Sequence, residues 1–423
     1  MPIDRTKAPE LHPIQKFSYI YPNKLGVAAN YEYWGLHSDK NPIVKLEIVF
    51  PTGKRNASTS LVAILASKLF GKQTSSHSSD EIAEIIDNYG LIISATVEND
   101  FTHIKLFSVT KFTDAAFDLL EEMLLETQYG GKEFDNEVER QKTSFLINSE
   151  KTDFIAIREF YRNVYPDGYV KMMEHSDFET IEVKQVQNFF NEWFFTTPMT
   201  IVLSGDYSSE HVKRINKMLS RLPFKKNKST IKQPLFTKNK SYKCFEKNNA
   251  EQSSIVAGNI TISKTHKDFK KLMIVNTILG GYFGSRLSKN IREDKGYTYG
   301  VYSSLISYIN HSLFKIRADV GNEFVVDYQK EVEKEILRLH NELVSKEELD
   351  LVKNYLRGSL LSLFDGVFEQ ASVFASMRSF GLDFLYYDEF LKELNGVAQE
   401  EIMNIARKYL NVENMLTVVA GKC

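Results

Sequence analysis

The chain has 423 residues, too many for one ordinary hydrophobic core, so two or more domains are expected. Hydrophobic residues make up 43% of the sequence and charged residues 26%, as in soluble globular proteins. The formal net charge of −2 argues against nucleic acid or an anionic membrane as the main partner. No segment approaches the ~18 uninterrupted apolar residues of a membrane-spanning helix, so no span is predicted.

The N-terminal residues and the cysteines give an indication of the cellular compartment. The first residues, "MPIDRTKAPELHPIQKF", lack the apolar core of a signal peptide. The two cysteines, Cys244 and Cys423, are too few and too far apart for a disulfide framework or a zinc knuckle. We therefore predict isolated thiols and a cytoplasmic protein.

The first half of the chain alternates strands with helices. Ile43–Phe50, "IVKLEIVF", has the alternation of a half-buried strand. The segment "SLVAILASKLFG", Ser60–Gly71, has the length and apolar spacing of a buried helix, and a second helix is predicted through Ile82–Asn88. Two strands follow, "LIISATVE" and "THIKLFSV", and then an amphipathic helix, "TDAAFDLLEEMLLET".

The order of elements recurs in the second half. The segment Val183–Asp206 resembles Gln399–Lys422: each predicts a helix, a short turn and an apolar strand that ends in glycine, at Gly205 and Gly421. The earlier elements have counterparts in "SIVAGNITI", "FKKLMIVNTILGG", "LSKNIRED", "YGVYSSLISY", "HSLFKIRADV" and "VVDYQKEVEKEILRLHNEL". We predict an α+β protein of two homologous units, each a mixed, mostly antiparallel sheet with helices packed on one face.

A basic segment separates the two units. We place the first unit at residues 1–222, a linker at 223–242 and the second unit at 243–423. The linker region, "PFKKNKSTIKQPLFTKNKSYK", has two prolines, many lysines and no acid, which is typical of an exposed connection. A basic binding patch is the alternative, but the lysines lack interleaved aromatic residues and arginines.

Three strings carry a family resemblance. They are "LVAILASKLFGKQTSSHSSDEIAEIIDNYG" with the following "SATVENDFTHI", then "FDNEVERQKTSFLINSE", and "ILGGYFGSRLSKNIREDKGYTYGVYS". Together with the duplication, they make the chain from about Ile43 to Gly421 resemble the insulinase/pitrilysin-type zinc peptidases, which include mitochondrial processing peptidase. The resemblance implies the processing-peptidase-like metallohydrolase fold.

The resemblance also implies a degenerate metal site. Active members carry H-x-x-E-H on the first helix, where two histidines bind zinc and the glutamate activates the metal-bound water. The corresponding positions here are Ala63, Ala66 and Ser67. A further glutamate ligand follows an "ER" pair, and alignment on Glu139–Arg140 puts Asn148 at that ligand position, within one or two residues. None of the nine histidines forms a pair at metal-ligand spacing, so we expect this chain to bind no metal or other cofactor.

A second pair of family positions is retained. Family members place an arginine and a tyrosine seven residues apart in the second unit, where they hold the substrate backbone and the developing oxyanion. Arg292 and Tyr299 have that spacing in "REDKGYTY", and Tyr297 is the competing phenol. A guanidinium and a phenol supply hydrogen-bond donors where negative charge develops. The alternative is a surface arginine at a helix end and a core aromatic.

Two further strings belong to the same comparison. Ser94, Ala95 and Thr96 of "SATVE" correspond to the strand beside which family substrates lie by adding a strand to the sheet edge, although these residue types suit any strand. Glycines also occur at the end of the helix "FKKLMIVNTILGG". Related subunits use a longer glycine-rich loop there to touch substrate, whereas capping and tight packing are expected for this shorter version.

These features lead to two hypotheses. In the first, the chain is the non-zinc-binding subunit of a heterodimeric peptidase, inactive alone, and supplies Arg292 and Tyr299 in trans to a zinc site on a homologous partner that cleaves unfolded peptides. In the second, it is a non-catalytic scaffold or peptide-binding homologue, heterodimeric or self-paired, that has lost peptidase activity.

Overall fold

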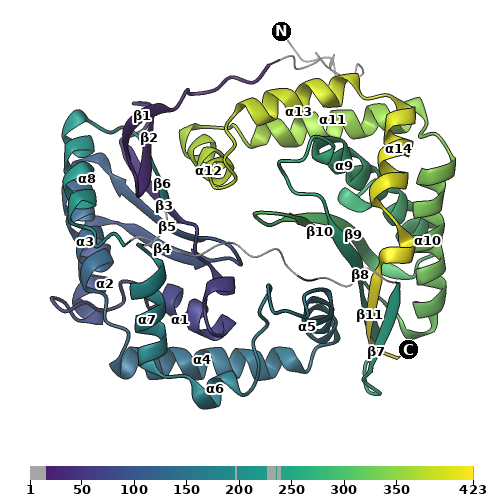
Figure 1. Cartoon of the computed structure of the whole chain (residues 1–423), viewed down its shortest axis with the longest axis horizontal. Coiled ribbons are helices and arrows are strands. Elements are labelled where there is room, and N and C mark those ends of the chain that lie inside the picture. Colours follow the sequence, from purple (N-terminus) through teal and green to yellow (C-terminus); the bar gives the residue numbers. More distant parts are fainter. Residues whose placement is uncertain (1–15, 196–197, 226–234, 236–239, 423) are drawn as a thin grey trace, which may run out of the picture.

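The computed structural model describes residues 16–195, 198–225, 235 and 240–422. Two β-sheets stand side by side, each with its own layer of helices on the outside (Figure 1). The first half of the chain contains β1 (Asn23–Ala28), β2 (Tyr31–His37), β3 (Ile43–Phe50), α1 (Ser60–Leu69), α2 (Ser79–Tyr89), β4 (Ile92–Val97), β5 (Thr102–Val109), α3 (Thr113–Glu126), α4 (Gly131–Ser149), α5 (Thr152–Val164), α6 (Asp177–Thr180), α7 (Val183–Trp193), β6 (Met199–Gly205) and α8 (Ser209–Arg221).

The second half repeats much of this order. It contains β7 (Ser241–Glu246), β8 (Gln252–Thr261), α9 (Phe269–Asn276), a π-helix η3 (Thr277–Gly281), a second π-helix η4 (Ser288–Asp294), β9 (Thr298–Ser307), β10 (Ser312–Gly321), α10 (Val325–Asn341), α11 (Lys346–Ser362), α12 (Val367–Arg378), α13 (Leu385–Gly396), α14 (Gln399–Tyr409) and β11 (Leu416–Gly421). Four 3₁₀ turns complete the assignment, at Lys54–Asn56 (η1), Thr110–Phe112, Asn322–Phe324 and Val412–Asn414.

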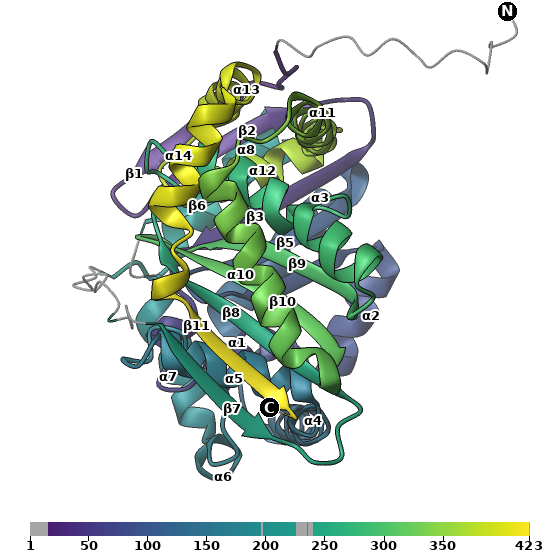
Figure 2. The ribbon, with the colours of Figure 1, turned by 90° about the vertical axis from the view of Figure 1, so that its right-hand side faces the viewer.

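The two sheets have the same topology. The first has the strand order β1-β2-β6-β3-β5-β4 and the second β7-β11-β8-β10-β9. In each, one pair is parallel, β2 with β6 and β7 with β11, and the other pairs are antiparallel. Figure 2 shows β7 and β11 side by side, with the C-terminus at the end of β11. The predicted α+β fold of two homologous units is therefore confirmed, with β1 as an addition to the first sheet.

Successive side chains along the central strand β3 point to opposite faces of the sheet and so belong to two different hydrophobic cores. In β3, Val44, Leu46, Ile48 and Phe50 pack with the helices of their own half, α1, α3 and α7 among them. Their neighbour Val49 points to the opposite face and belongs to the core of the second half. Both faces of this sheet are therefore covered, because the strand period of two sends alternate side chains to opposite sides.

The opposite face of each sheet is covered by a helix from the other half of the chain, and we call these two the exchanged helices. α12, from the second half of the chain, packs on β6, β3 and β2 of the first sheet. α5, from the first half, packs on β8 and β11 of the second sheet. Phe374 of α12 lies edge-to-face against Trp34 of β2, with ring centroids 5.2 Å apart, and Phe160 of α5 is fully buried. Each half of the chain thus supplies a helix that covers the sheet of the other half.

An ion pair is buried under α12. The Nζ atom of Lys45 lies 2.6 Å from a carboxylate oxygen of Glu47, and both side chains are almost fully buried. The hydroxyl of Ser372 in α12 accepts a hydrogen bond from Lys45 and donates one of 3.0 Å to Glu47. Burial alone raises the pKa of Glu47, but the hydrogen bond with His103 and the charge of Lys45 outweigh it and hold this pKa at about 2.

Several predictions made from the sequence can be compared with the observed fold. The predicted strand Ile43–Phe50 has the observed bounds of β3, and Gly205 and Gly421 both adopt positive φ, of 97° and 137°, at the ends of matching strands. The expectation of isolated thiols is wrong for Cys244, which is disulfide-bonded, and Cys423 lies outside the described residues. Most of the predicted linker, 223–242, also lies outside them. Among the described helices, none has the length and apolar character needed to cross a membrane.

Candidate functional site

The three positions of the metal motif lie on α1 and face the protein interior. Ala63, Ala66 and Ser67 are all buried, with Ala63 at 0% exposure. The Ser67 hydroxyl donates a 3.0 Å hydrogen bond to the backbone carbonyl of Ala95 in β4. Where the family motif has two zinc-binding histidines and a glutamate base, this helix therefore presents two methyl groups and a hydroxyl, and the hydroxyl ties α1 to the edge of the first sheet.

The fourth position lies on the helix that packs against α1. Asn148, near the end of α4, accepts a 2.9 Å hydrogen bond from the ammonium of Lys151 and donates a long one, 3.4 Å, to Ser144. The nearest carboxylate along the chain is Glu150, which forms an ion pair of 2.6 Å with Lys247 of the second half. The predicted position is thus close to α1, but it carries an amide.

These residues do not fit a zinc ion. Zinc sites in proteins use cysteine, histidine and carboxylate donors in groups of three or four. No such group of three exists anywhere in the part of the chain that the structure describes. Ala63 and Ala66 offer no donor atom, and the hydroxyl of Ser67 is already used for a hydrogen bond to Ala95.

The strand predicted to receive peptides is an edge strand. Among the described strands, β4 pairs only with β5, and it forms one edge of the first sheet. Its side chains alternate between exposed and half-buried, and Ser94 and Thr96 are on the exposed side. An edge strand presents unpaired backbone groups that an extended peptide can use. Ser94, Ala95 and Thr96 therefore lie at a sheet edge, where strand addition occurs, and the carbonyl of Ala95 already accepts the hydrogen bond from Ser67.

Arg292 lies in an unusual helix. η4 is a seven-residue π-helix, and such i→i+5 turns are rare and frequent at functional sites. The guanidinium of Arg292 lies 3.8 Å from the ring centroid of Phe283, which is itself largely exposed. Its one described ion pair is a loose contact of 3.5 Å with Glu293. The guanidinium is therefore held in place by an aromatic face, and Glu293 is its one polar contact among the described residues.

Tyr299 is presented to solvent by an irregularity in β9. Thr298 pairs with Val320 and Val301 pairs with Ala318, so two residues of β9 oppose a single residue of β10. This is the pattern of a β-bulge, which redirects side chains and often lies next to active sites. The hydroxyl of Thr298 fixes the bulge with a 2.6 Å hydrogen bond to the carbonyl of Asp319. The side chain of Tyr299 is 91% exposed, so it is not a core aromatic.

The competing phenol and the glycines have structural roles. Tyr297 stacks on Phe324, with ring centroids 4.5 Å apart, and is partly buried. A Cβ atom on Gly280 would lie 2.8 Å from the backbone nitrogen of Ser303, so tight packing of η3 on β9 requires glycine there. Gly281 and Gly284 keep negative φ, like Gly280, so none of the three forms a left-handed cap. The expectation of tight packing is borne out at Gly280.

One feature was missed by sequence reasoning. A cavity of about 450 Å³ lies beside the N-terminus of α1, and α4, α5 and the turn after β9 also line it. Asn148 is one of its lining residues, together with Lys54, Ser60 and Asn99. The sequence did contain one indication of this cavity, the pair Thr59–Ser60. These two hydroxyl residues stand at the start of an apolar helix, and the helix lacks the acidic residue, three positions after the N-cap, that would complete a capping box.

Comparison with known proteins gives consistent results. The model described as "Insulinase (Peptidase family M16)" matches residues 35–161, and the model described as "Peptidase M16 inactive domain" matches residues 180–356. A Bacillus subtilis protein named "Uncharacterized zinc protease YmxG" is 22% identical over 390 residues, which covers 90% of this chain and 95% of that protein. A Helicobacter pylori protein named "Non-peptidase homolog YmxG" is 21% identical over 356 residues, 80% of each chain.

Solved structures share the fold. The crystal structure of a peptidase M16 inactive domain from Pseudomonas fluorescens superposes with a TM-score of 0.87 at 20% identity, over 95% of this chain and 98% of that one. A protease structure from Helicobacter pylori gives a TM-score of 0.85 at 16% identity, over 95% and 100%. With the duplicated topology and the altered metal motif on α1, these matches show that the chain belongs to the insulinase family of M16 peptidases as an inactive-type member.

Proposed function

We propose that this chain is the non-zinc-binding subunit of a two-subunit M16 peptidase that hydrolyses unfolded peptides. One contrast carries the proposal. The motif positions Ala63, Ala66 and Ser67 are buried and already packed, while Arg292 lies in a π-helix with its side chain 28% exposed and Tyr299 is exposed at a β-bulge. Donors with few partners among the described residues are suited to a site completed by another molecule. A homologous partner subunit would hold the zinc.

The roles of this chain's residues follow from their chemistry. The guanidinium of Arg292 and the phenol of Tyr299 would donate hydrogen bonds to the carbonyl oxygen of the peptide bond under attack, where negative charge develops. The stacking of Arg292 on Phe283 limits its motion, so less entropy is lost when it engages the substrate. Residues Ser94–Thr96 on the edge strand β4 would hold the peptide in extended form.

The test is a complex with a zinc-bearing M16 chain of similar length. We expect Arg292→Ala and Tyr299→Phe each to lower kcat by about 10²–10³, as loss of one oxyanion donor does elsewhere, with zinc content and complex formation unchanged. Arg292→Lys should recover little, because an ammonium cannot reproduce the planar fork of donors. Tyr297→Phe is the matched control and should have wild-type turnover. Turnover within twofold of wild type in both donor variants would overturn the proposal.

The second candidate is a scaffold or peptide-binding homologue without catalysis, either with a partner or as a homodimer. The name "Non-peptidase homolog" of the Helicobacter pylori relative favours it. Pull-down followed by metal analysis separates the two candidates. A zinc-containing, peptide-cleaving complex supports the first, and a metal-free assembly that binds peptides without cleaving them supports the second.

A further inference from the structure

The cavity beside α1 has an unusual balance of charge. Two ammonium groups, of Lys54 and Lys171, line it, and none of the described residues around it is Asp or Glu. Apolar side chains form much of the rest, among them Phe145, Met172 and Tyr308. A volume of about 450 Å³ with apolar walls and a few polar groups is typical of a site for a small ligand or part of a peptide.

Lys54 is the free cation of this cavity. Within the described part of the chain its Nζ atom has no hydrogen bond and no ion pair, and Glu98 acts on its pKa only through its charge. Burial lowers the pKa of Lys54, so its ammonium is poorly compensated. Lys171, by contrast, donates to the backbone carbonyls of Arg55 and Ala57.

The backbone fixes Lys54 in this position. Its N–H donates a 2.9 Å hydrogen bond to the carbonyl of Glu98, and the N–H of Arg55 donates one of 3.1 Å to Asn99. A Cβ atom on Gly53 would lie 2.4 Å from the Asn99 carbonyl oxygen, so only glycine permits this close approach. The turn that follows β4 is thus locked against the start of η1, and Asn99 and Lys54 line the cavity together.

The start of α1 adds unused donors. Thr59, the N-cap residue, makes no side-chain capping hydrogen bond. Ser60 lines the cavity at 3% exposure, and its hydroxyl has no partner among the described residues. A helix N-terminus presents unpaired N–H groups and a partial positive charge that favour an anion. An unpaired buried hydroxyl costs free energy unless a ligand or water satisfies it.

We propose that this cavity binds the carboxylate of a peptide. The carboxylate would accept hydrogen bonds from Ser60 and the first turn of α1 and pair with Lys54, while the apolar wall takes the neighbouring side chain. The buried Oδ1 atom of Asn99 has no partner among the described residues and provides an acceptor for a peptide N–H. The inference deepens the proposed handling of peptides, but it concerns this chain alone and needs neither a partner nor zinc.

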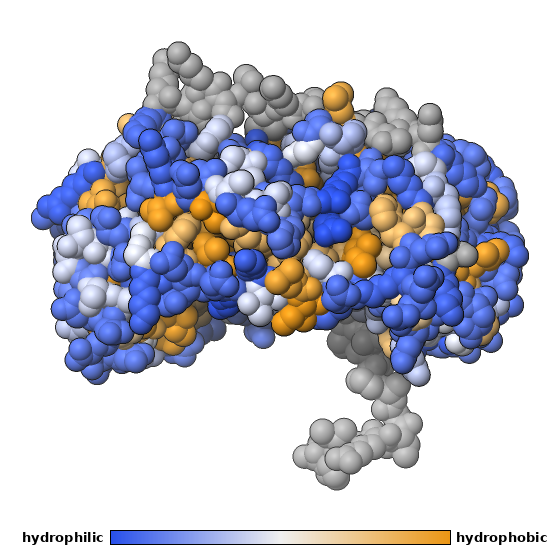
Figure 3. Space-filling model, turned by 90° about the horizontal axis from the view of Figure 1, so that it is seen from below, coloured by the Kyte–Doolittle hydropathy of each residue, from blue (hydrophilic) through white to orange (hydrophobic). Residues whose placement is uncertain are grey.

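The location supports a peptide as the occupant. Asn99 follows β4 by two residues, so the cavity lies at the end of the edge strand on which an extended peptide would pair. The face of the molecule that carries α4 and α6 is mainly hydrophilic, with apolar residues in separate patches and no continuous apolar surface (Figure 3). Our proposal for this side therefore rests on the localised charged cavity and not on a broad apolar surface.

Calorimetric titration of the purified full chain tests the proposal with three peptides. They are acetyl-Gly-Gly-Leu with a free carboxylate, its C-terminal amide, and acetyl-Gly-Glu-Leu amide, which carries the carboxylate on a side chain. We expect at least one of the two carboxylate peptides to bind tenfold or more tightly than the uncharged amide. Added salt should weaken this preference, because it rests on charge. The peptide that is preferred identifies a terminal or a side-chain carboxylate as the ligand.

Variants connect the preference to the cavity. Lys54→Met should reduce the preference for the carboxylate at least tenfold without changing the affinity for the amide, and Lys54→Arg should retain most of it. Lys330→Met, at an exposed ion pair with Asp327 on α10, is the matched control and should behave like wild type.

Two results would overturn the inference. One is equal binding of all three peptides by the wild-type chain, a result that needs no variant. The other is binding of inorganic phosphate alone at the strength of the carboxylate peptides, which indicates an adventitious ion only. Either result would leave the roles proposed for Arg292 and Tyr299 untouched, because turnover with a partner measures those separately.

Discussion

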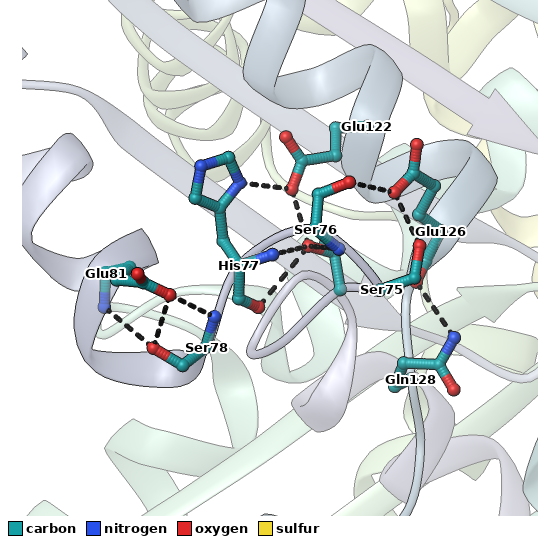
Figure 4. Close-up of polar contacts among 9 residues, drawn as sticks. Ser75, Ser76, His77, Ser78, Glu81, Glu122, Glu126 and Gln128 are labelled. Carbon is teal, nitrogen blue, oxygen red and sulfur yellow. Dashed lines mark hydrogen bonds and ion pairs between the residues drawn. The ribbon is translucent and has the colours of Figure 1, made fainter.

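At the residue scale, the loop between α1 and α2 is held by two glutamates of α3. Nδ1 of His77 lies 2.9 Å from a carboxylate oxygen of Glu122, and the hydroxyls of Ser75 and Ser76 each donate a 2.6 Å hydrogen bond to Glu126 (Figure 4). The next residue, Ser78, caps α2 and forms a capping box with Glu81. This loop follows α1, the helix that carries the altered metal motif.

This loop gives a prediction for pH dependence. The hydrogen bond with Glu122, and then its charge, raise the pKa of His77. The resulting stabilisation is fully present below the unfolded-state pKa of about 6.5 and is lost as pH rises through the higher folded-state pKa. His77→Ala should therefore lower Tm more at about pH 6 than at about pH 8.5. Thermal unfolding across this range measures the difference.

The control for this prediction is His175→Ala. His175 makes a looser and more exposed contact of 3.4 Å with Glu179, so its replacement should have a smaller effect. A Tm difference for His77→Ala that is constant across the pH range, or that grows at high pH, would contradict the prediction.

At this scale the sequence identified most of the candidate site. The spacing of Arg292 and Tyr299 and the residue types at Ala63, Ala66 and Ser67 became informative once the family resemblance assigned these positions, and their roles stay a prediction. What could not be read was the presentation of the two retained residues, because a π-helix and a β-bulge arise from hydrogen-bond register and have no fixed residue signature. The cavity at Ser60 was missed for a related reason: it is lined by segments that are distant in sequence.

At the scale of the elements, the ion pair of Lys45 with Glu47, both in β3 and buried under α12, can be tested. Removing one partner of a buried pair leaves the other charge uncompensated. We expect Lys45→Met to lower the free energy of unfolding by about 3 kcal/mol, the lower end of the usual range because His103 and Lys105 also approach Glu47. Urea unfolding followed by tryptophan fluorescence is suitable, since Trp34 packs against Phe374 of α12.

A double variant completes this test. Lys45→Met with Glu47→Leu removes both charges and should be more stable than Lys45→Met alone, because apolar replacements of both partners avoid an unpaired charge. A double variant that is less stable than the single one would show that Glu47 is compensated by its other neighbours.

The internal sequence repeat predicted the helices and strands better than it predicted how they pack. The matching segments Val183–Asp206 and Gln399–Lys422 gave a helix and a strand in each half, and both pairs are present as α7 with β6 and α14 with β11. By contrast, α5 and α12 were not placed. An amphipathic pattern shows that a helix has a buried face, but it carries no information on which sheet covers that face.

At the scale of the whole molecule, the exchanged helices couple the two halves. Phe160 lies in the first half of the chain, yet its helix covers β8 and β11 of the second. We expect Phe160→Ala to cost about 3–5 kcal/mol, as other buried Phe→Ala changes do, and to speed amide hydrogen exchange in β8 and β11. Hydrogen exchange read by mass spectrometry locates the effect.

The matched control is Phe117→Ala in α3. Phe117 is equally buried, but it belongs to the core of the first half. Its truncation should speed exchange mainly in β3, β5 and β6. If Phe160→Ala acted on those strands and spared β8 and β11, the coupling described for α5 would be refuted.

The packing of α12 and α5 on the sheet of the other half also has a consequence for biosynthesis. A ribosome releases this chain from its N-terminus, so β3 and β6 have emerged long before the residues of α12, Val367–Arg378, are made. During that interval the inner side of the first sheet, with Lys45, Glu47, Val49 and Val202, has no cover. A nascent chain of this design depends on finishing translation, or on a chaperone, to protect that surface.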